Sequence, residues 1–369
     1  MSNSMFEDIS DLQEIKNNYP ILENANHPES EAIKKDFLQT KIFNAPTYSA
    51  ATTSKGVLID LPTLADQVSQ LGIDASSLRM IQDFRSQTLA EISFLMQFGQ
   101  LSQGNVITEQ VREYNKKMFG RPTREEIQSA TQFITQNPSQ DAIKTLTYES
   151  LVDIFNQTLE QEGLANHDWR VTTKESGPVS VRPKSHEVIV PTSERIFSQQ
   201  EIERLAIHEI TVHAFRRFNG ELVEAETGFP LKDNWPRYLA TEEGMASFIE
   251  IQSGYKDTNT LRKYAARLIA VDAAFNGESF NQIFDLLVNY DFEQSEAFDI
   301  VWRCFRRGGY LKDGEYWKGL HQIQQIHETT PERIKRLFAG KVNHEHFHLI
   351  ENDIPQGLYG RIKLPVCLR

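Results

Sequence analysis

The sequence L-A-I-H-E-I-T-V-H at residues 205–213 is the strongest indication of the fold and the chemistry of this chain. Apolar residues recur at helical spacing from about Gln199, so we expect the stretch to lie on a helix. Within it, His208 and His213 flank Glu209. Zinc hydrolases carry two histidines and a glutamate on one helix in a closely similar pattern. The stretch therefore predicts a metal-binding helix.

The two histidines stand one residue further apart than in the common pattern. Histidines four residues apart differ by about 40° around a helix of 3.6 residues per turn. His208 and His213 are five apart, and a regular helix would separate them by about 140°. A one-residue π-type bulge would bring both imidazoles to one ion, and such bulges are enriched at functional sites. We therefore predict a π-type bulge in this helix.

A catalytic zinc site needs a third protein ligand and an open fourth position. The sequence L-A-T-E-E-G-M-A at residues 239–246 indicates a second helix that would pack behind the metal. Glu243 is the predicted third ligand, with Glu242 as the alternative, because periodicity cannot separate adjacent residues. Glu209 is the predicted general base, which would take a proton from the attacking water.

The remaining pattern predicts a mainly α protein with one small antiparallel β-sheet, an α+β fold. Apolar spacings of three and four indicate helices over residues 78–96 and 148–164. Thr108 and Thr123 each precede an acidic first turn, as helix N-caps do. Valines among turn residues between positions 169 and 190 predict the sheet.

Composition excludes several classes of protein. The 369 residues include 51 acidic and 39 basic side chains, and a net charge of −12 argues against nucleic-acid binding over a broad surface. No apolar run reaches the roughly 20 residues of a membrane span. The N-terminus carries acids where a secretory signal carries lysines, and only Cys304 and Cys367 occur. We expect a cytoplasmic protein, no membrane partner, and an inert core thiol at Cys304.

The last part of the chain differs from the rest. Residues 301–369 hold 12 basic and 7 acidic side chains, a net charge of +5, which could face an anionic ligand. His344, His346 and His348 alternate, and on a strand they would share one face. That pattern is more typical of a polar strand face than of a second metal site.

Three blocks of sequence carry a resemblance to a known family. They are H-E-I-T-V-H-A-F-R-R-F-N-G at 208–220, A-T-E-E-G-M-A at 240–246 and R-R-G-G-Y-L-K-D-G-E-Y-W at 306–317. Together they resemble the metallopeptidase family of flavohaemoglobin expression-modulating QEGLA-motif proteins, whose eukaryotic members include the microtubule-associated tyrosine carboxypeptidases. The family's name motif corresponds to E-E-G-M-A here. A literal Q-E-G-L-A at 161–165 is interpreted as a helix end capped at Gly163.

The resemblance implies a gluzincin-like metallopeptidase fold over about residues 60–340. It implies one zinc ion per chain, held by His208, His213 and Glu243, with Glu209 as the catalytic base. We expect an acidic N-terminal extension at 1–50, a helical support region at 51–165, the catalytic core at 166–340, and a C-terminal segment at 341–369 packed on that core.

A carboxypeptidase must also hold the terminal carboxylate of its substrate. Arginine does so with two parallel hydrogen bonds, and the third block supplies the candidates Arg306, Arg307 and Lys312. Tyr310 or Tyr316 could donate a hydrogen bond to the tetrahedral oxyanion. The alternative is an ordinary loop whose arginines form surface ion pairs. Arg216 and Arg217 are expected on the surface of their helix.

The sequence thus predicts a zinc-dependent metallocarboxypeptidase that releases a C-terminal residue from a peptide or protein. Family resemblance supplies tyrosine and the tubulin tail as the eukaryotic precedent. Two alternatives stay open: an N-terminal exopeptidase resembling dipeptidyl peptidase III, and a non-catalytic regulatory protein that binds zinc. A pair of acids that grasps an α-amine would favour the first alternative, whereas retention of Glu209 speaks against the second.

Overall fold

The computed structural model describes residues 10–16, 19, 27–53, 58–70, 79–97, 101–102, 104–140, 143–175, 177–192, 194–235, 237–348, 351–352 and 354–369. Contacts divide the chain into two compact units. The first comprises Met1–Ser139 and Thr260–Lys318, and the second comprises Gln140–Asn259 and Gly319–Arg369. Each unit therefore combines two separate stretches of sequence. The expected division at residues 50, 165 and 340 follows chain order instead, and it stays a prediction.

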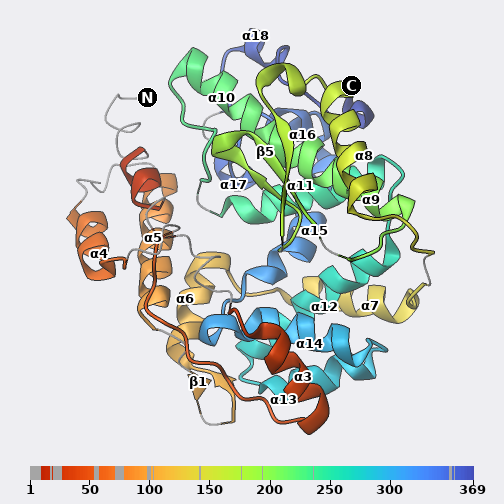
Figure 1. The fold of residues 1–369 in the computed structure, drawn as a ribbon. Helices are drawn as coiled ribbons and strands as arrows, with labels where there is room; N and C mark the ends of the chain where they lie inside the picture. The colour runs from red at the N-terminus through yellow and green to blue at the C-terminus, as the bar shows by residue number, and fades with distance from the viewer. Residues whose placement is uncertain are drawn as a thin grey trace. The chain divides into compact units, whose positions relative to one another are not determined.

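The first unit is mainly helical (Figure 1). In chain order it contains α3 (Ser30–Thr40), α4 (Leu61–Gln70), α5 (Arg79–Met96), β1 (Leu101–Ser102), β2 (Val106–Ile107), α6 (Glu109–Phe119), α7 (Arg124–Gln136), most of α12 (Thr258–Phe275), α13 (Phe280–Asn289), α14 (Gln294–Phe305), the 3₁₀ turns η4 (Arg306–Gly308) and η5 (Lys312–Gly314), and the start of α15 (Glu315–Thr329). Strands β1 and β2 form a short antiparallel ribbon.

Both predicted helix caps of this unit are confirmed. The Thr108 hydroxyl accepts a hydrogen bond from the Val111 N–H at the start of α6. At the start of α7, Thr123 accepts from the Glu126 N–H while the Glu126 carboxylate accepts from the Thr123 N–H. Each cap satisfies backbone donors that have no partner inside the helix, which fixes where the helix begins.

Aromatic side chains fill the core of the first unit. Phe37, within the expected N-terminal extension, lies on α3 and packs edge-on against Phe280 and Phe284 at ring-centroid distances of 5.0 and 4.9 Å. Cys304 is fully buried on α14, and burial raises the pKa of its thiol to about 12. The expectation of an inert core thiol is thereby supported, since the thiolate is the reactive form.

The second unit places a small sheet beside several helices (Figure 1). It contains α8 (Tyr148–Gln161), η1 (Ala165–His167), β3 (Arg170–Lys174), β4 (Ser180–Arg182), η2 (Pro183–Ser185), β5 (Glu187–Pro191), α9 (Gln199–Ala206), η3 (Ile207–Ala214), α10 (Phe215–Thr227), α11 (Tyr238–Gln252), the remainder of α15, α16 (Pro331–Leu337), α17 (His344–Phe347), α18 (Gln356–Tyr359) and η6 (Val366–Leu368). In the part of the chain that the structure describes, no helix is both long and apolar enough to cross a membrane.

The sheet is mixed, so the prediction of an antiparallel sheet is half wrong. Its strand order is β3-β5-β4, with β4 antiparallel to β5 and β3 parallel to β5. The turn at η2 joins β4 and β5 as a hairpin, whereas β3 joins the opposite edge of β5. Alternating valines indicate strands, but they do not indicate which edge a third strand takes.

The literal Q-E-G-L-A sequence is a helix end, as predicted. Helix α8 stops at Gln161, and Gly163 adopts a positive φ of 70°. The N–H of Leu164 then donates to the carbonyl of Leu159 at 2.9 Å, which closes the helix.

The expectation of an extended strand at His344, His346 and His348 is wrong. Residues 344–347 form the short helix α17, capped by Asn343. Positions two apart on a helix differ by about 200°, so His346 points away from His344 and the three histidines do not share one face.

Helices α11 and α15 meet backbone to backbone within the second unit. A Cβ atom at Gly244 would lie 2.2 Å from the carbonyl carbon of Gly319, and one at Gly319 would lie 1.9 Å from the Ala240 oxygen. Only glycine allows this approach. The glycine of the E-E-G-M-A motif therefore sets the position of the helix that carries Glu242 and Glu243.

Candidate metal centre

The helix that carries the two histidines changes its geometry at the motif. The backbone is π-helical over η3, between the α-helices α9 and α10. The predicted bulge is thereby confirmed. Wider turns of the backbone bring residues five apart onto nearly one face, and the His208 and His213 ring centroids lie 4.7 Å apart.

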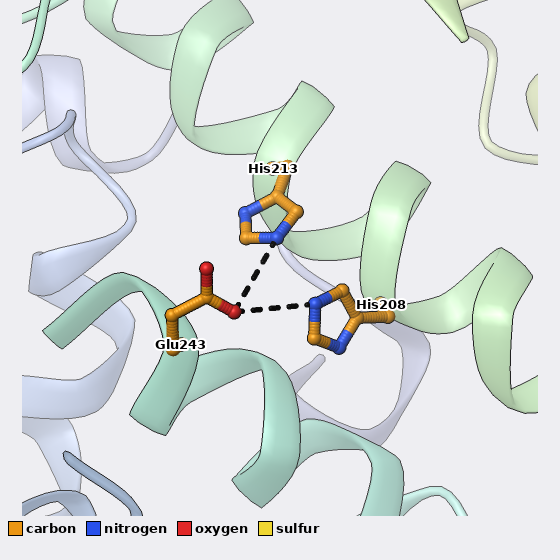
Figure 2. Close-up of side chains that lie close together, drawn as sticks. All are labelled: His208, His213 and Glu243. Atoms are coloured by element: carbon orange, nitrogen blue, oxygen red, sulfur yellow. Dashed lines mark ion pairs between the residues drawn. The ribbon is translucent and has the colours of Figure 1, made fainter. Parts of the chain in front are cut away.

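A carboxylate from α11 completes the cluster. Glu243 Oε2 lies 3.4 Å from His208 Nε2 and 4.0 Å from His213 Nε2, and Figure 2 shows both rings facing it. One ligand atom from each of the three residues falls within 4.8 Å of the others. His208 and Glu243 are buried, and His213 is nearly so. These are the side chains, among the described residues, that could together hold a metal ion.

The second ring nitrogen of each histidine meets a different carboxylate. His208 Nδ1 lies 2.6 Å from Glu250 Oε1, and His213 Nδ1 lies 2.8 Å from Glu242 Oε1. Glu242 and Glu250 are both 2% exposed. A buried carboxylate accepts the Nδ1 proton, so each neutral ring keeps its lone pair on Nε2, the nitrogen that faces Glu243.

Cations from three parts of the unit neutralise these carboxylates. Arg216 Nη1 bonds Glu242 Oε2, and Lys341 Nζ donates to Glu242 Oε1 at 2.6 Å. Burial alone would raise the pKa of Glu242, but Lys341 and Arg216 outweigh burial and hold that pKa well below its ordinary value. Arg204 Nη1 donates to Glu250 Oε1 at 2.9 Å. Glu242 is thus ionised, and it lies against His213.

Glu209 stands beside the cluster, in the turn between the two histidines. Its side chain is 8% exposed. Burial raises the pKa of the Glu209 carboxyl, and a positive charge on His213 or His208, when either ring is protonated, would oppose that rise. Burial therefore makes the Glu209 carboxylate a stronger proton acceptor than a solvated carboxylate, as a general base requires.

The predicted substrate-binding residues belong to the first unit. They lie in and after the loop that follows α14, and Arg306, Arg307, Tyr310 and Lys312 are buried. Arg306 Nη2 donates to the fully buried Asp313 at 3.2 Å, and Arg303 Nη2 donates to it at 2.6 Å. The ion pair that Arg306 forms is therefore buried, not on the surface as the alternative interpretation expected.

The aromatic candidates of this loop lie beside its cations. The Arg306 guanidinium is 5.8 Å from the Tyr310 ring, and Lys312 Nζ is 5.5 Å from the Tyr316 ring. Arg307 donates to the Ser49 carbonyl, and burial lowers the pKa of Arg307 to about 10. Tyr316 also stacks on Tyr264. The metal cluster lies in the second unit and these five candidates lie in the first, so their role toward a substrate stays a prediction.

Sequence reasoning missed the residues behind the cluster. Arg216 and Arg217 were expected on the helix surface, but they are 0% and 6% exposed, so that expectation is wrong. Glu250 was missed entirely. It stands seven residues after Glu243, two turns along the same face of a helix whose other nearby residues are apolar or small. A lone acid in such a setting requires a buried partner, and that signal could have identified it.

Fold and site together define a class: a mainly helical protein whose α11 and π-helical segment bring two imidazoles and a carboxylate to one point. Within that class, the chain belongs to the microtubule-associated tyrosine carboxypeptidase family, because the model of that family matches residues 35–368. The resemblance drawn from the three sequence blocks is thereby confirmed. A search of curated proteins gives no match.

Among solved structures, the chain is similar to one described as a putative lipoprotein from Colwellia psychrerythraea. The two share 13% sequence identity with a TM-score of 0.49. The match covers 82% of this chain and 65% of that chain's length. At this level of similarity neither fold detail nor function transfers from that protein.

Proposed function

We propose that this chain is a zinc-dependent metallocarboxypeptidase with a gluzincin-like catalytic core. The observation that carries the proposal is the convergence of His208 Nε2, His213 Nε2 and Glu243 Oε2, with Glu209 buried in the turn between the histidines. A purely structural site has no use for an extra buried carboxyl group at that position. Family membership supports the carboxypeptidase reaction.

The donor set fits zinc. Two imidazole nitrogens and one carboxylate oxygen are the ligands of many catalytic zinc sites, and three protein ligands leave a fourth position open. Both Nδ1 atoms are already engaged by Glu242 and Glu250, so the two Nε2 atoms are the ones available to a metal. His208, His213 and Glu243 would hold one zinc ion per chain.

The bound metal and Glu209 would then have separate roles in peptide hydrolysis. Bound zinc would supply a Lewis acid that lowers the pKa of a water molecule and polarises the scissile carbonyl. Glu209 would take the proton of the attacking water and deliver it to the leaving amine. The burial that raises the pKa of Glu209 favours the first of these transfers, because a poorly hydrated carboxylate accepts a proton more readily than a fully hydrated one.

The substrate is proposed to be the C-terminus of a peptide or protein. Arg306, Arg307 and Lys312 are the candidates for its carboxylate, and Tyr310 or Tyr316 for the oxyanion. The family's name supplies tyrosine as the released residue. The tubulin tail is proposed as a substrate on the eukaryotic precedent that the resemblance supplies. Neither a nucleic acid nor a membrane is proposed as a partner.

The decisive experiment is to incubate the zinc-loaded protein with a diverse peptide library and identify the products by mass spectrometry. Loss of single C-terminal residues supports the proposal. Loss of N-terminal residues would favour the exopeptidase alternative, and no loss from a zinc-loaded protein would favour a regulatory role.

The matching variant is Glu209→Gln. Because Glu209 is not among the three ligands, we expect zinc content near that of the unmodified protein and a loss of hydrolysis of at least about 100-fold. Glu203→Gln is the control, since Glu203 is a partly exposed residue of α9 whose carboxylate accepts a hydrogen bond from the Gln199 side chain and lies outside the cluster. Turnover by Glu209→Gln at the rate of that control would refute the mechanism.

A further inference from the structure

Glu242 and Glu250 are buried acids that the reaction itself does not use. We infer that they are positioning residues for the metal ligands, and that Lys341 from the C-terminal segment acts on the metal centre through Glu242. The inference rests on the proposed zinc site, and it assigns roles to residues outside the ligand set.

One helix provides the whole carboxylate framework. Glu242, Glu243 and Glu250 all lie on α11, which is buried from Ala240 to Glu250. Glu243 faces both histidines, while Glu242 and Glu250 each bond one ring from behind, at 2.8 and 2.6 Å. A single rigid element thus fixes the third ligand and the orientation of the other two.

The hydrogen bonds determine which nitrogen can bind the metal. A carboxylate that accepts a proton from Nδ1 holds the ring in the tautomer whose lone pair is on Nε2, and it also increases the basicity of the ring. Without that acceptor, each ring can rotate or place its proton on Nε2. Carboxylates that lie behind the ligands contribute about 10- to 100-fold to metal affinity in comparable sites.

Glu242 depends on cations that arrive from distant positions in the sequence. Lys341 follows α16, 98 residues after Glu243, and its Nζ shares Glu242 Oε1 with His213 Nδ1. Arg216 holds the other oxygen, and its Nη2 donates to the Val342 carbonyl at 2.9 Å. The C-terminal segment is therefore bonded to the helix that carries the histidines and to the carboxylate behind one of them.

The two histidines are supported unequally. Glu242 has two buried cations, Arg216 and Lys341, whereas Glu250 has Arg204, which lies 4.0 Å from Asp257 as well. Removal of Lys341 leaves Glu242 with Arg216, so the carboxylate stays ion-paired and the variant is expected to fold. Lys341→Met therefore tests the positioning role without removing a ligand or a ligand's direct partner.

The experiment measures zinc affinity by competition with a chromophoric chelator for the unmodified protein and four variants. For Glu250→Gln and Lys341→Met we expect zinc affinity to fall about 10- to 100-fold, with Lys341→Arg restoring most of it. Lys335→Met is the matched control, because Lys335 forms an exposed ion pair with Glu332 in the same unit. We expect this substitution to leave the zinc affinity unchanged.

Two further readouts separate positioning from a merely structural role. Thermal unfolding of the zinc-free proteins measures the effect on the fold alone, and ¹⁵N chemical shifts of the imidazoles report the tautomer of His208 and His213. We expect the Nδ1-protonated tautomer in the unmodified zinc-free protein and a mixture in Glu250→Gln. Zinc affinity within twofold of the control in both Glu250→Gln and Lys341→Met would overturn the inference, even if their zinc-free forms were less stable.

The same titration distinguishes this inference from the proposed function. Stoichiometric zinc binding that weakens in the variants, combined with an uncleaved peptide library, would keep the inference and refute the peptidase. Peptide cleavage with zinc affinity unchanged in the variants would do the reverse. No zinc binding by the unmodified protein would refute both.

Discussion

His213 stands five residues after His208, and its ring faces Glu243 because the intervening backbone is π-helical. Removing this imidazole takes away one of three proposed ligands while leaving the helix intact. For His213→Ala we expect the zinc content, measured by elemental analysis after dialysis, to fall from about one per chain to well below half. His348→Ala is the control, because His348 is exposed and follows α17 rather than the cluster. Equal zinc content in the two variants would contradict the ligand assignment.

Adjacent residues show what sequence reasoning could and could not settle at this scale. Five-residue spacing predicted the π-helix, since only a wider turn brings His208 and His213 together. Glu242 and Glu243 could not be separated, because both acids serve the cluster: one faces the two Nε2 atoms and the other bonds Nδ1 of His213. Helical periodicity predicts which face of a helix a residue occupies. It does not predict which nitrogen of a histidine ring that residue contacts.

Arginine positions were the weakest part of the sequence interpretation. A long charged side chain on a helix is usually solvated, so Arg216 was expected at the surface. It is fully buried because Glu242, 26 residues away on another helix, forms an ion pair with it. An ion pair between residues so far apart in the sequence cannot be predicted from local sequence patterns. It forms because α11 packs against the π-helical segment.

At the scale of elements, the close contact of α11 with α15 can be tested for its effect on the position of Glu243. Gly244→Ala would place a Cβ 2.2 Å from the Gly319 carbonyl carbon, and backbone rather than a flexible side chain would have to move. We expect a loss of about 1–3 kcal/mol in the free energy of unfolding, measured by urea denaturation. Zinc affinity should fall as well, because Glu243 immediately precedes the displaced residue.

Gly357→Ala provides the comparison for that variant. Gly357 lies in α18, and a Cβ added there would have nothing within 4 Å, so the new methyl group meets open space. The unfolding free energy and zinc affinity of Gly357→Ala should match those of the unmodified protein. If Gly244→Ala behaves in the same way, the two helices are not held at the distance that the glycines imply.

The sequence predicted the positions of helices and strands more reliably than it predicted how the strands pair. The helix starts at Thr108 and Thr123 depend on hydrogen bonds within four residues, and both were identified from sequence. The sheet depends on which edge of β5 receives β3, a choice made by chain segments with no local signature. The position of the small sheet before the π-helical segment was foreseen, and its mixed topology was not.

At the scale of the whole chain, part of the positive charge of residues 301–369 lies inside the two units. The net charge of +5 over residues 301–369 suggested a surface facing an anion. In the structure, Arg303 and Arg306 bond the buried Asp313 in the first unit, and Lys341 bonds the buried Glu242 in the second. Part of the excess therefore neutralises buried acids. The interleaved composition of the two units could not be foreseen, because local periodicity carries no information on which distant stretches share a core.

The acid stability of the first unit should follow from Asp313. Burial alone would raise the pKa of this carboxyl, but Arg303, Lys312 and Arg306 outweigh burial and hold the pKa far below its ordinary value. A depressed pKa in the folded state means that the carboxylate stabilises the fold at every pH above the ordinary value of about 4. That contribution is lost as the pH falls below about 4 toward the folded-state value, so stability should decline over this range.

For Asp313→Asn we expect a loss of about 3–5 kcal/mol in the free energy of unfolding at pH 7, because Arg303 and Arg306 lose the carboxylate between them inside the unit. The variant should also show a shallower decline as the pH falls below about 4, since the group that titrates has been removed. Hydrogen exchange of α13 and α14, followed by mass spectrometry across that pH range, locates the effect in the first unit. Asp285→Asn, which removes an exposed carboxylate of the same unit, should keep both the stability and the decline of the unmodified protein. An unchanged pH dependence in Asp313→Asn would mean that other carboxylates govern the acid transition and that the ion pairs around Asp313 contribute little to it.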